Sequence, residues 1–192
     1  MNQPTDLEME LQQWFSRTGK QTLRELGVRA GDVALDLGCG PGRFTVPLAQ
    51  AVSPGGKVMA VDRNPDALNQ LTERLEAWAS SCQVQCVRTD GPGALKALDD
   101  RSLDVVLLFD VLQHMEDWDA LLDHLSRAIK PDGLLLVYPA AVPHPGRVDM
   151  DRFGALAEDH GFQAAGRRDV RLPHAYSVVD DKVYLFRRLA IR

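Results

Sequence analysis

The chain has 192 residues, of which 45% are hydrophobic and 26% charged, the composition of a globular protein with a sizeable buried core. A formal net charge of −5 argues against nucleic acid as a partner, and no apolar run approaches the ~20 residues of a membrane-spanning helix. The three cysteines, Cys39, Cys82 and Cys86, suit neither a disulfide framework nor a zinc site, and the N-terminus lacks a secretory signal. We therefore expect no metal, no membrane and a cytoplasmic location.

The N-terminal segment, residues 1–30, is predicted to form a helical cap. Its pattern between residues 6 and 27 favours one or two helices whose apolar face includes Trp14 and Phe15. These two aromatic residues have two interpretations, because they can anchor the cap to the core or border the site of an acceptor.

Residues 31–140 alternate short apolar runs with amphipathic stretches. The runs predict five strands, Val33–Leu37, Lys57–Asp62, Gln83–Val87, Leu103–Phe109 and Gly133–Tyr138. The stretches between them predict helices over 43–51, 65–79 and 118–129. Near-continuous apolar strands are typical of parallel sheets that are covered on both faces. This segment therefore predicts a doubly wound α/β core with helices on both faces of the sheet.

Residues 141–192 are predicted to add a helix and a hairpin. The helix covers Asp151–His160 and ends at a glycine, and antiparallel strands follow over Arg167–Leu172 and Lys182–Leu189. His144, in the proline-rich loop before this helix, is either an exposed loop residue or a base. We find no linker composition, so residues 1–192 are expected to form a single domain.

A glycine-rich turn follows the first strand, in the sequence Asp36-Leu37-Gly38-Cys39-Gly40-Pro41-Gly42. Glycines permit a tight strand-to-helix turn and the close approach of a nucleotide ligand. Compared with the dinucleotide fingerprint, the third glycine comes one residue early and Arg43 occupies its place. The carboxylate of Asp36 also suits a ligand with an ammonium group better than a pyrophosphate. A nicotinamide-dependent oxidoreductase is therefore the less favoured alternative.

Asp62 ends the second strand, about 20 residues beyond the turn, as expected of a βαβ unit. A carboxylate at this point can accept hydrogen bonds from both ribose hydroxyls of a nucleoside. The alternative is a helix-capping turn with the following Asn64.

From Val33 to Tyr138 these ordered motifs resemble the class I S-adenosylmethionine-dependent methyltransferases that act on small molecules. The resemblance implies a Rossmann-like seven-stranded sheet, mostly parallel with an antiparallel C-terminal strand. It implies that the glycine turn holds the methionine part of the cofactor, through Asp36, Gly38, Cys39, Gly40 and Gly42. At the adenosine end it implies ribose contacts from Asp62, adenine contacts from Asp90 and Gly91, and cover of the ring by Arg63.

The segment after the fourth strand, from Phe109 to Asp117, resembles the part of the family that lies beneath the sulfonium. The resemblance implies cofactor contacts from Phe109, Asp110 and Gln113. His114 is the candidate catalytic residue, with three interpretations that stay open: a general base, a residue that orients the cofactor or loop, or a packing residue.

We therefore expect methyl transfer from S-adenosylmethionine to a small-molecule acceptor, with S-adenosylhomocysteine as the product. The sequence around Gly55 and Asp62 is most similar to the branch of quinone-type C-methyltransferases and arsenite methyltransferases, although the cysteines do not suit arsenic. A binding protein without transfer activity is the alternative. The C-terminal arginines favour a solvated sheet edge over nucleic-acid binding, and a homodimer through this edge stays open.

Overall fold

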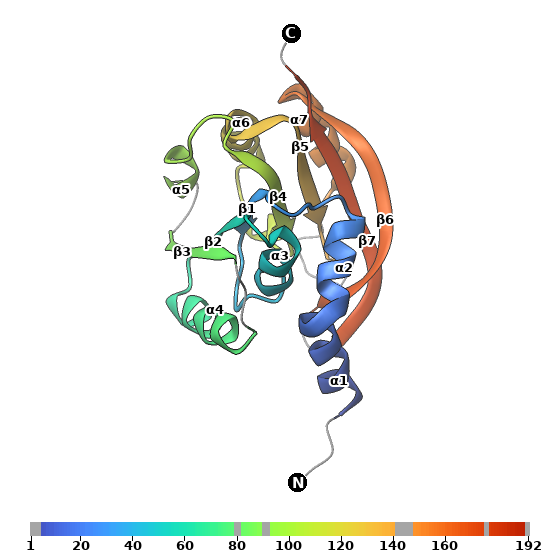
Figure 1. The fold of residues 1–192 in the computed structure, drawn as a ribbon. Helices are drawn as coiled ribbons and strands as arrows, with labels where there is room; N and C mark the ends of the chain where they lie inside the picture. The colour runs from blue at the N-terminus through green and yellow to red at the C-terminus, as the bar shows by residue number, and fades with distance from the viewer. Residues whose placement is uncertain (1–4, 79–81, 90–92, 141–147, 175–176, 191–192) are drawn as a thin grey trace.

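The computed structural model describes residues 5–78, 82–89, 93–140, 148–174 and 177–190. They form a seven-stranded sheet in the order β3-β2-β1-β4-β5-β7-β6 (Figure 1). The strands are β1 (Val33–Leu37), β2 (Lys57–Asp62), β3 (Gln83–Arg88), β4 (Leu103–Phe109), β5 (Ile129–Tyr138), β6 (Phe162–His174) and β7 (Ser177–Arg188). Strands β1 to β5 are parallel, and β7 pairs antiparallel with both β5 and β6. The predicted mostly parallel, Rossmann-like sheet is confirmed.

Helices cover both faces of this sheet. In chain order they are α1 (Asp6–Gln13), the π-helix η1 (Trp14–Thr18), α2 (Gly19–Glu25), α3 (Thr45–Val52), α4 (Pro65–Ala77), α5 (Gly93–Lys96), the 3₁₀-helix η2 (Leu112–His114), α6 (Trp118–Ala128) and α7 (Met150–Asp159). In Figure 1, α2 and α3 lie in front of the sheet and α6 and α7 lie behind it. The sheet is therefore the middle layer of three.

Two apolar cores fill the spaces between these layers. Along β4, Val105, Leu107 and Phe109 point into the core beneath α2, α3 and α4, whereas Val106 and Leu108 point into the core beneath α6 and α7. The alternation follows from the two-residue period of a strand. Because both faces are covered, the strand reads in the sequence as one apolar run rather than as alternating apolar and polar residues.

The predicted strand positions agree with the structure for β1 to β4, and the differences lie at the ends of other elements. The helix predicted over 118–129 ends at Ala128, because Ile129 already pairs with Leu103 as the first residue of β5. Strand β6 begins at Phe162 rather than at Arg167, since residues 163–166 are exposed and show no apolar alternation, and β7 begins at Ser177 rather than at Lys182. The short helix α5 was not predicted.

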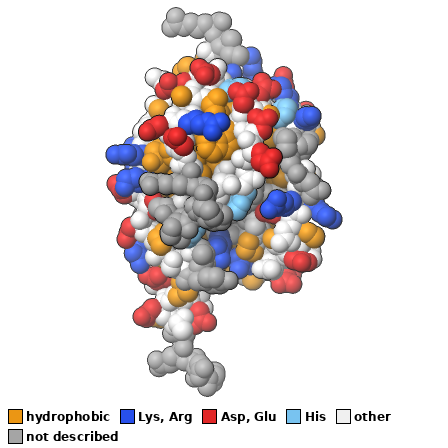
Figure 2. Space-filling view, turned by 180° about the vertical axis from the view of Figure 1, so that it is seen from behind, with side chains coloured by type: hydrophobic (Ala, Val, Ile, Leu, Met, Phe, Trp, Pro, Cys, Tyr) orange, Lys and Arg blue, Asp and Glu red, His pale blue; other side chains and the backbone are white. Residues whose placement is uncertain are grey.

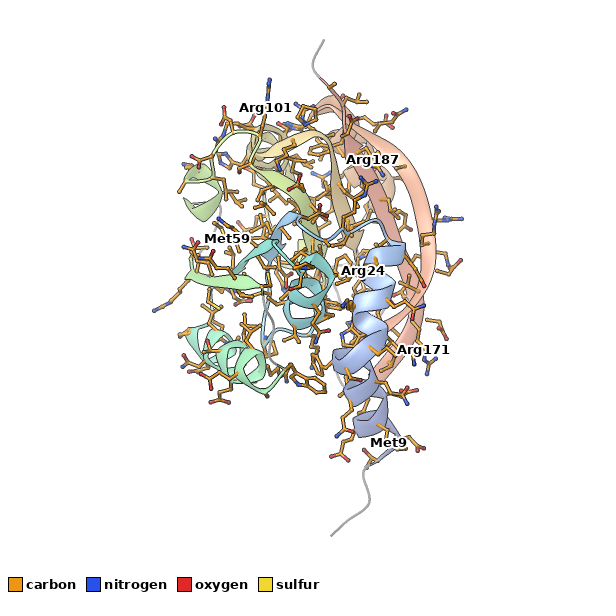
Figure 3. The ribbon with its side chains drawn as sticks, viewed as in Figure 1. Met9, Arg24, Met59, Arg101, Arg171 and Arg187 are labelled. Carbon is orange, nitrogen blue, oxygen red and sulfur yellow. The ribbon has the colours of Figure 1, made fainter. Side chains whose placement is uncertain are left out.

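The N-terminal helices pack against α3 and against the hairpin of β6 and β7. Trp14 and Phe15 are buried, so their anchoring role is confirmed. The guanidinium of Arg24 donates to the carbonyls of Ala51 and Ser53 at the end of α3. On the other side, Arg171 of β6 forms ion pairs with Glu10 and Asp180, beside α1 in Figure 3. These polar contacts attach the N-terminal helices to α3 on one side and to the hairpin of β6 and β7 on the other.

Arg187 and Arg188 also make contacts within the chain. Arg187 donates to the carbonyl of Asp132, and Arg188 donates to the carbonyls of Ser126 and Gly161. On the face covered by α6 and α7, acidic and basic side chains are interspersed (Figure 2). Within the described part of the chain, every helix is too short or too polar to cross a bilayer.

Candidate functional site

The glycine turn folds back over the end of β2. The amides of Gly38 and Cys39 both donate to the carbonyl of Val61, at 2.8 and 3.0 Å. Gly38 and Gly42 have φ values of 76° and 85°, in the left-handed region that favours glycine. A Cβ added at Gly38 would lie 2.4 Å from a methyl of Val111, and one added at Gly42 would lie 2.4 Å from a methyl of Leu71. Both glycines are therefore required by close packing.

Gly40 faces the other way, because a Cβ added there would meet no heavy atom within 4 Å. Its amide donates to Oδ2 of Asp62 at 2.7 Å, which joins the ends of β1 and β2. Oδ1 of Asp62 accepts from the amide of Asn64 at 2.8 Å, so the helix-capping role foreseen as an alternative is present as well. Because a carboxylate oxygen can accept two hydrogen bonds and each oxygen of Asp62 accepts one here, the carboxylate keeps acceptor capacity for two ribose hydroxyls.

Asp36 lies behind this turn and is 1% exposed. Its Oδ2 accepts from the hydroxyl of Thr45, the first residue of α3, at 2.6 Å. Burial and the nearby charge of Asp62 raise the pKa of Asp36 to about 6, against the opposing hydrogen bond from Thr45. A cation bound at the turn would favour the ionised form. That Asp36 lies near the amino group of the cofactor stays a prediction.

Two side chains that sequence reasoning did not assign to the turn hold its carbonyls. The indole Nε1 of Trp14 donates to the carbonyl of Arg43 at 2.8 Å, and the guanidinium of Arg74 from α4 donates to the carbonyl of Pro41 at 2.9 Å. The partners are 29 and 33 residues apart in the chain, so no local pattern could have indicated them. A groove of about 280 Å³ between the N-terminal helices and the hairpin also borders Trp14.

The end of β4 contributes a second polar group beside the turn. Asp110 has a φ of 54°, a costly conformation for a residue other than glycine, and its amide donates to the carbonyl of Tyr138. Nε2 of Gln113 donates to the carbonyl of Asp110 at 3.0 Å and to its Oδ1 at 2.6 Å. Within the described part of the chain, Oε1 of Gln113 is buried and has no hydrogen-bond partner. A donor or a cation is therefore required near it.

The same edge of the sheet also carries His174, which sequence reasoning missed. Its Nδ1 lies 3.4 Å from Oδ2 of Asp110, and its ring packs edge-on against Tyr138 with 6.2 Å between centroids. Burial raises the pKa of Tyr138, and the nearby carboxylates of Asp181 and Asp110 raise it further. No sequence signal singles out His174, because it is 64 positions from Asp110.

The other predicted site residues occupy different environments. Phe109 is 3% exposed and packs edge-on against Phe44, with 4.9 Å between centroids, so its side chain belongs to the core. His114 lies exposed on η2, and Arg63 lies exposed after Asp62. Burial raises the pKa of the Cys39 thiol, which keeps it protonated. Asp90, Gly91 and His144 lie outside the described residues.

These groups fit the chemistry of an adenosine that carries a cationic amino-acid tail. The carboxylate of Asp62 suits ribose, the open side of Gly40 admits a ligand close to the backbone, and Oε1 of Gln113 requires a donor or a cation. Among the described residues, no group of three or more His, Cys, Asp or Glu side chains could hold a metal ion.

The sheet order and the glycine turn define a Rossmann-like α/β protein whose ligand edge is at the carboxyl ends of β1, β2 and β4. Residues 35–135 match the family described as a methyltransferase domain. The chain therefore belongs to the class I S-adenosylmethionine-dependent methyltransferase family, whose cofactor is S-adenosylmethionine.

Curated relatives and solved structures agree with this assignment. The chain is 32% identical over 124 residues to a demethylmenaquinone methyltransferase of Lactobacillus johnsonii, a match that covers 65% of this chain and 50% of that protein. A protein of the same name from Staphylococcus aureus is also 32% identical, over 65% of this chain and 49% of its own length. The chain thus spans about half the length of these relatives.

Two solved structures share the fold. An S-adenosylmethionine-dependent methyltransferase from Aquifex aeolicus has a TM-score of 0.67 at 20% identity, covering 96% of this chain and 98% of its own. A magnesium protoporphyrin IX methyltransferase from Synechocystis, solved with bound S-adenosylmethionine, has a TM-score of 0.65 at 21% identity, covering 98% and 86%.

Proposed function

We propose that this chain transfers a methyl group from S-adenosylmethionine to a small-molecule acceptor and releases S-adenosylhomocysteine. One observation carries the proposal: the amide of Gly40 donates to Oδ2 of Asp62, next to a turn whose outer side is open. This contact supports the assignment of Asp62 to the ribose, because the carboxylate lies beside the backbone that would hold the methionine part. We assign the remaining cofactor contacts to Asp36, Gly38, Cys39, Gly42, Arg63, Asp90, Gly91, Phe109, Asp110 and Gln113.

The cofactor, when bound, supplies an electrophilic methyl group on sulfur. The residues of this chain then have to hold and orient it and to exclude water, because positioning accounts for much of the catalysis of such a transfer. Asp62 and the glycine turn would hold its two ends, and Asp110 and Gln113 would contact the part between them. The acceptor class that we favour is a quinone-type ring, since the similar proteins include demethylmenaquinone methyltransferases.

The test measures binding and transfer separately. Asp62→Ala is expected to weaken S-adenosylmethionine binding in calorimetry by about 1.5–3 kcal/mol, the range for hydrogen bonds to a charged group. Asp66→Ala, an exposed carboxylate in the first turn of α4, is the matched control and should bind as wild type does. Equal affinity of the two variants for S-adenosylmethionine would show that Asp62 does not bind the cofactor. Transfer is followed as release of S-adenosylhomocysteine with a panel of acceptors, and binding without release would favour the non-catalytic alternative.

We also propose a cytoplasmic location, a single domain over residues 1–192, and no nucleic-acid substrate. Cys39, Cys82 and Cys86, which the structure describes, form no disulfide, in agreement with a reducing compartment. The internal contacts of Arg171, Arg187 and Arg188 support a structural role for the C-terminal arginines. A homodimer through the edge strand β6 stays an open prediction, for which sedimentation velocity is the direct measurement.

A further inference from the structure

His174 and Asp110 form an imidazole–carboxylate pair at the ligand edge of the sheet. The sheet order makes β6 run in the same direction as β5, so His174, the last residue of β6, lies at the carboxyl edge with Asp110. Nδ1 of His174 is buried and lies 3.4 Å from Oδ2 of Asp110. This separation is longer than a good hydrogen bond and short enough for one to form with a small adjustment.

Both members of the pair are held in place from other elements. The second carboxylate oxygen of Asp110 accepts from Gln113 at 2.6 Å, and its backbone is fixed in the left-handed region by the bond to Tyr138. The imidazole packs edge-on against Tyr138 and is 12% exposed. Since Nδ1 is buried, this exposure belongs to the other atoms of the side chain. The ring is thus oriented with Nδ1 toward the carboxylate.

We propose that His174, oriented by Asp110, is the base that takes a proton from the acceptor. A carboxylate beside Nδ1 favours the tautomer with hydrogen on Nδ1 and leaves the lone pair on Nε2. The acceptor is then a hydroxyl on an unsaturated carbon, a phenol or enol, whose proton has to leave. This inference rests on the proposed function, because the acceptor comes close to Asp110 and His174 only if the cofactor binds with its methyl group at the end of β4.

The step balances with groups already named. The O–H bond of the acceptor breaks and its proton moves to Nε2 of His174, which becomes an imidazolium beside the carboxylate of Asp110. The electron pair left on the acceptor forms the new bond to the methyl carbon, from oxygen or from the conjugated ring carbon. The methyl–sulfur bond breaks, and its electron pair leaves with sulfur. His174 then returns its proton to solvent.

The first experiment needs no acceptor. Long-range proton–nitrogen NMR of the full chain, with the His174 signals assigned by their loss in His174→Asn, reports which ring nitrogen carries hydrogen. We expect the Nδ1–H tautomer in wild type and a shift toward the Nε2–H tautomer in Asp110→Asn. An Nε2–H tautomer in wild type, or no response to Asp110→Asn, would overturn the assignment.

The second experiment separates a base from a residue that only packs. The probes are naphthohydroquinone, whose hydroxyl must lose a proton, and N,N-dimethylaniline, a weakly basic amine whose nitrogen keeps its lone pair at neutral pH. His174→Asn should lower S-adenosylhomocysteine release with the phenol by about 10²-fold or more and lower release with the amine far less. An equal loss with both probes would show a packing role and overturn the proposal.

His160→Asn is the matched control. His160 also faces a carboxylate, with Nε2 2.9 Å from Oδ1 of Asp119, but it precedes the opposite end of β6. That strand has 13 residues and is therefore about 40 Å long. The control should keep wild-type activity with both probes. Calorimetry with S-adenosylmethionine runs in parallel. Failure of the wild-type protein to bind the cofactor would contradict the proposed function. The tautomer measurement tests only the role of His174.

Discussion

At the scale of single residues, the buried carboxyl of Asp36 makes the stability of the fold depend on pH. Burial and the charge of Asp62 raise its pKa to about 6 in the folded chain, whereas the unfolded chain has the ordinary value of about 3.9. The folded state therefore binds this proton more tightly. The group contributes stability below about pH 4 and loses that contribution as the pH rises through about 6.

Asp36→Asn removes this titration and keeps the shape of the side chain. A pKa shift of about 2 units corresponds to about 3 kcal/mol, so the free energy of unfolding of the variant relative to wild type should increase by about 3 kcal/mol between about pH 4 and pH 7. Urea denaturation at a series of pH values measures the difference. In Asp66→Asn, where the carboxylate is exposed, the change with pH should be much smaller. A pH-independent difference for Asp36→Asn would contradict the raised pKa.

Substitutions at the glycines of the turn allow effects on stability and effects on S-adenosylmethionine affinity to be measured separately. Gly40→Ala adds a Cβ at a φ of 51° but without a clash, so we expect a loss of about 1–2 kcal/mol in stability and a marked loss of S-adenosylmethionine affinity. Gly31, in a turn before β1, also has a positive φ and open space at its Cβ position, so Gly31→Ala should lower stability and leave the affinity unchanged. Urea unfolding and calorimetry give the two readouts.

Gly38→Ala completes this set, because its Cβ would overlap Val111. Overpacking costs about 1–3 kcal/mol beyond the conformational penalty, so this variant should be less stable than Gly40→Ala. If Gly40→Ala lost stability as Gly38→Ala does and kept its affinity, the open side of the turn would not be the ligand side.

At the scale of elements, the N-terminal helices support the glycine turn through Trp14, which is 2% exposed and donates to the carbonyl of Arg43. Trp14→Phe keeps a large aromatic ring and removes the donor. We expect a loss of about 1–2 kcal/mol in stability, since a partly buried carbonyl loses its partner, and faster hydrogen exchange of the amides of Gly38, Cys39, Gly40 and Gly42. Trp78→Phe, whose ring packs against Phe15 at 5.7 Å, should leave exchange in the turn unchanged. Unaltered exchange in both variants would show that the N-terminal helices do not stabilise the glycine turn.

The elements also show how far the sequence alone can lead. The apolar runs located β1 and β4 because helices cover both faces of these strands, and the glycine turn was recognised because its residues are contiguous. The contacts of Trp14 with Arg43, Arg74 with Pro41, and His174 with Asp110 join residues that are distant in the chain. Side-chain periodicity carries no information about such pairs. The first residues of β6, before Arg167, were missed for a related reason, since residues 163–166 are exposed and lack a buried face.

At the scale of the whole molecule, two apolar cores share one sheet, so we expect the chain to unfold in a single step. Trp14 and Trp78 report on the core beneath α3 and α4, whereas Trp118 packs against Phe153 in the core beneath α6 and α7. Each strand of the central sheet contributes side chains to both cores, and loss of one core removes the support of the other. Variants with a single tryptophan should therefore show the same urea midpoint, coincident with the loss of far-ultraviolet circular dichroism.

Ligand binding tests the same coupling. A ligand that binds only the folded state stabilises it by RT ln(1 + [L]/Kd), about 2.7 kcal/mol at a hundredfold excess over Kd. Because the candidate site is built from the ends of β1, β2 and β4, at the centre of the sheet, S-adenosylmethionine should shift the midpoints of the Trp14 and Trp118 reporters equally. A shift confined to Trp14 would mean that residues 1–30 unfold as a separate unit, against a single domain over 1–192. Asp62→Ala at the same ligand concentration is the control, since weakened binding should reduce both shifts together.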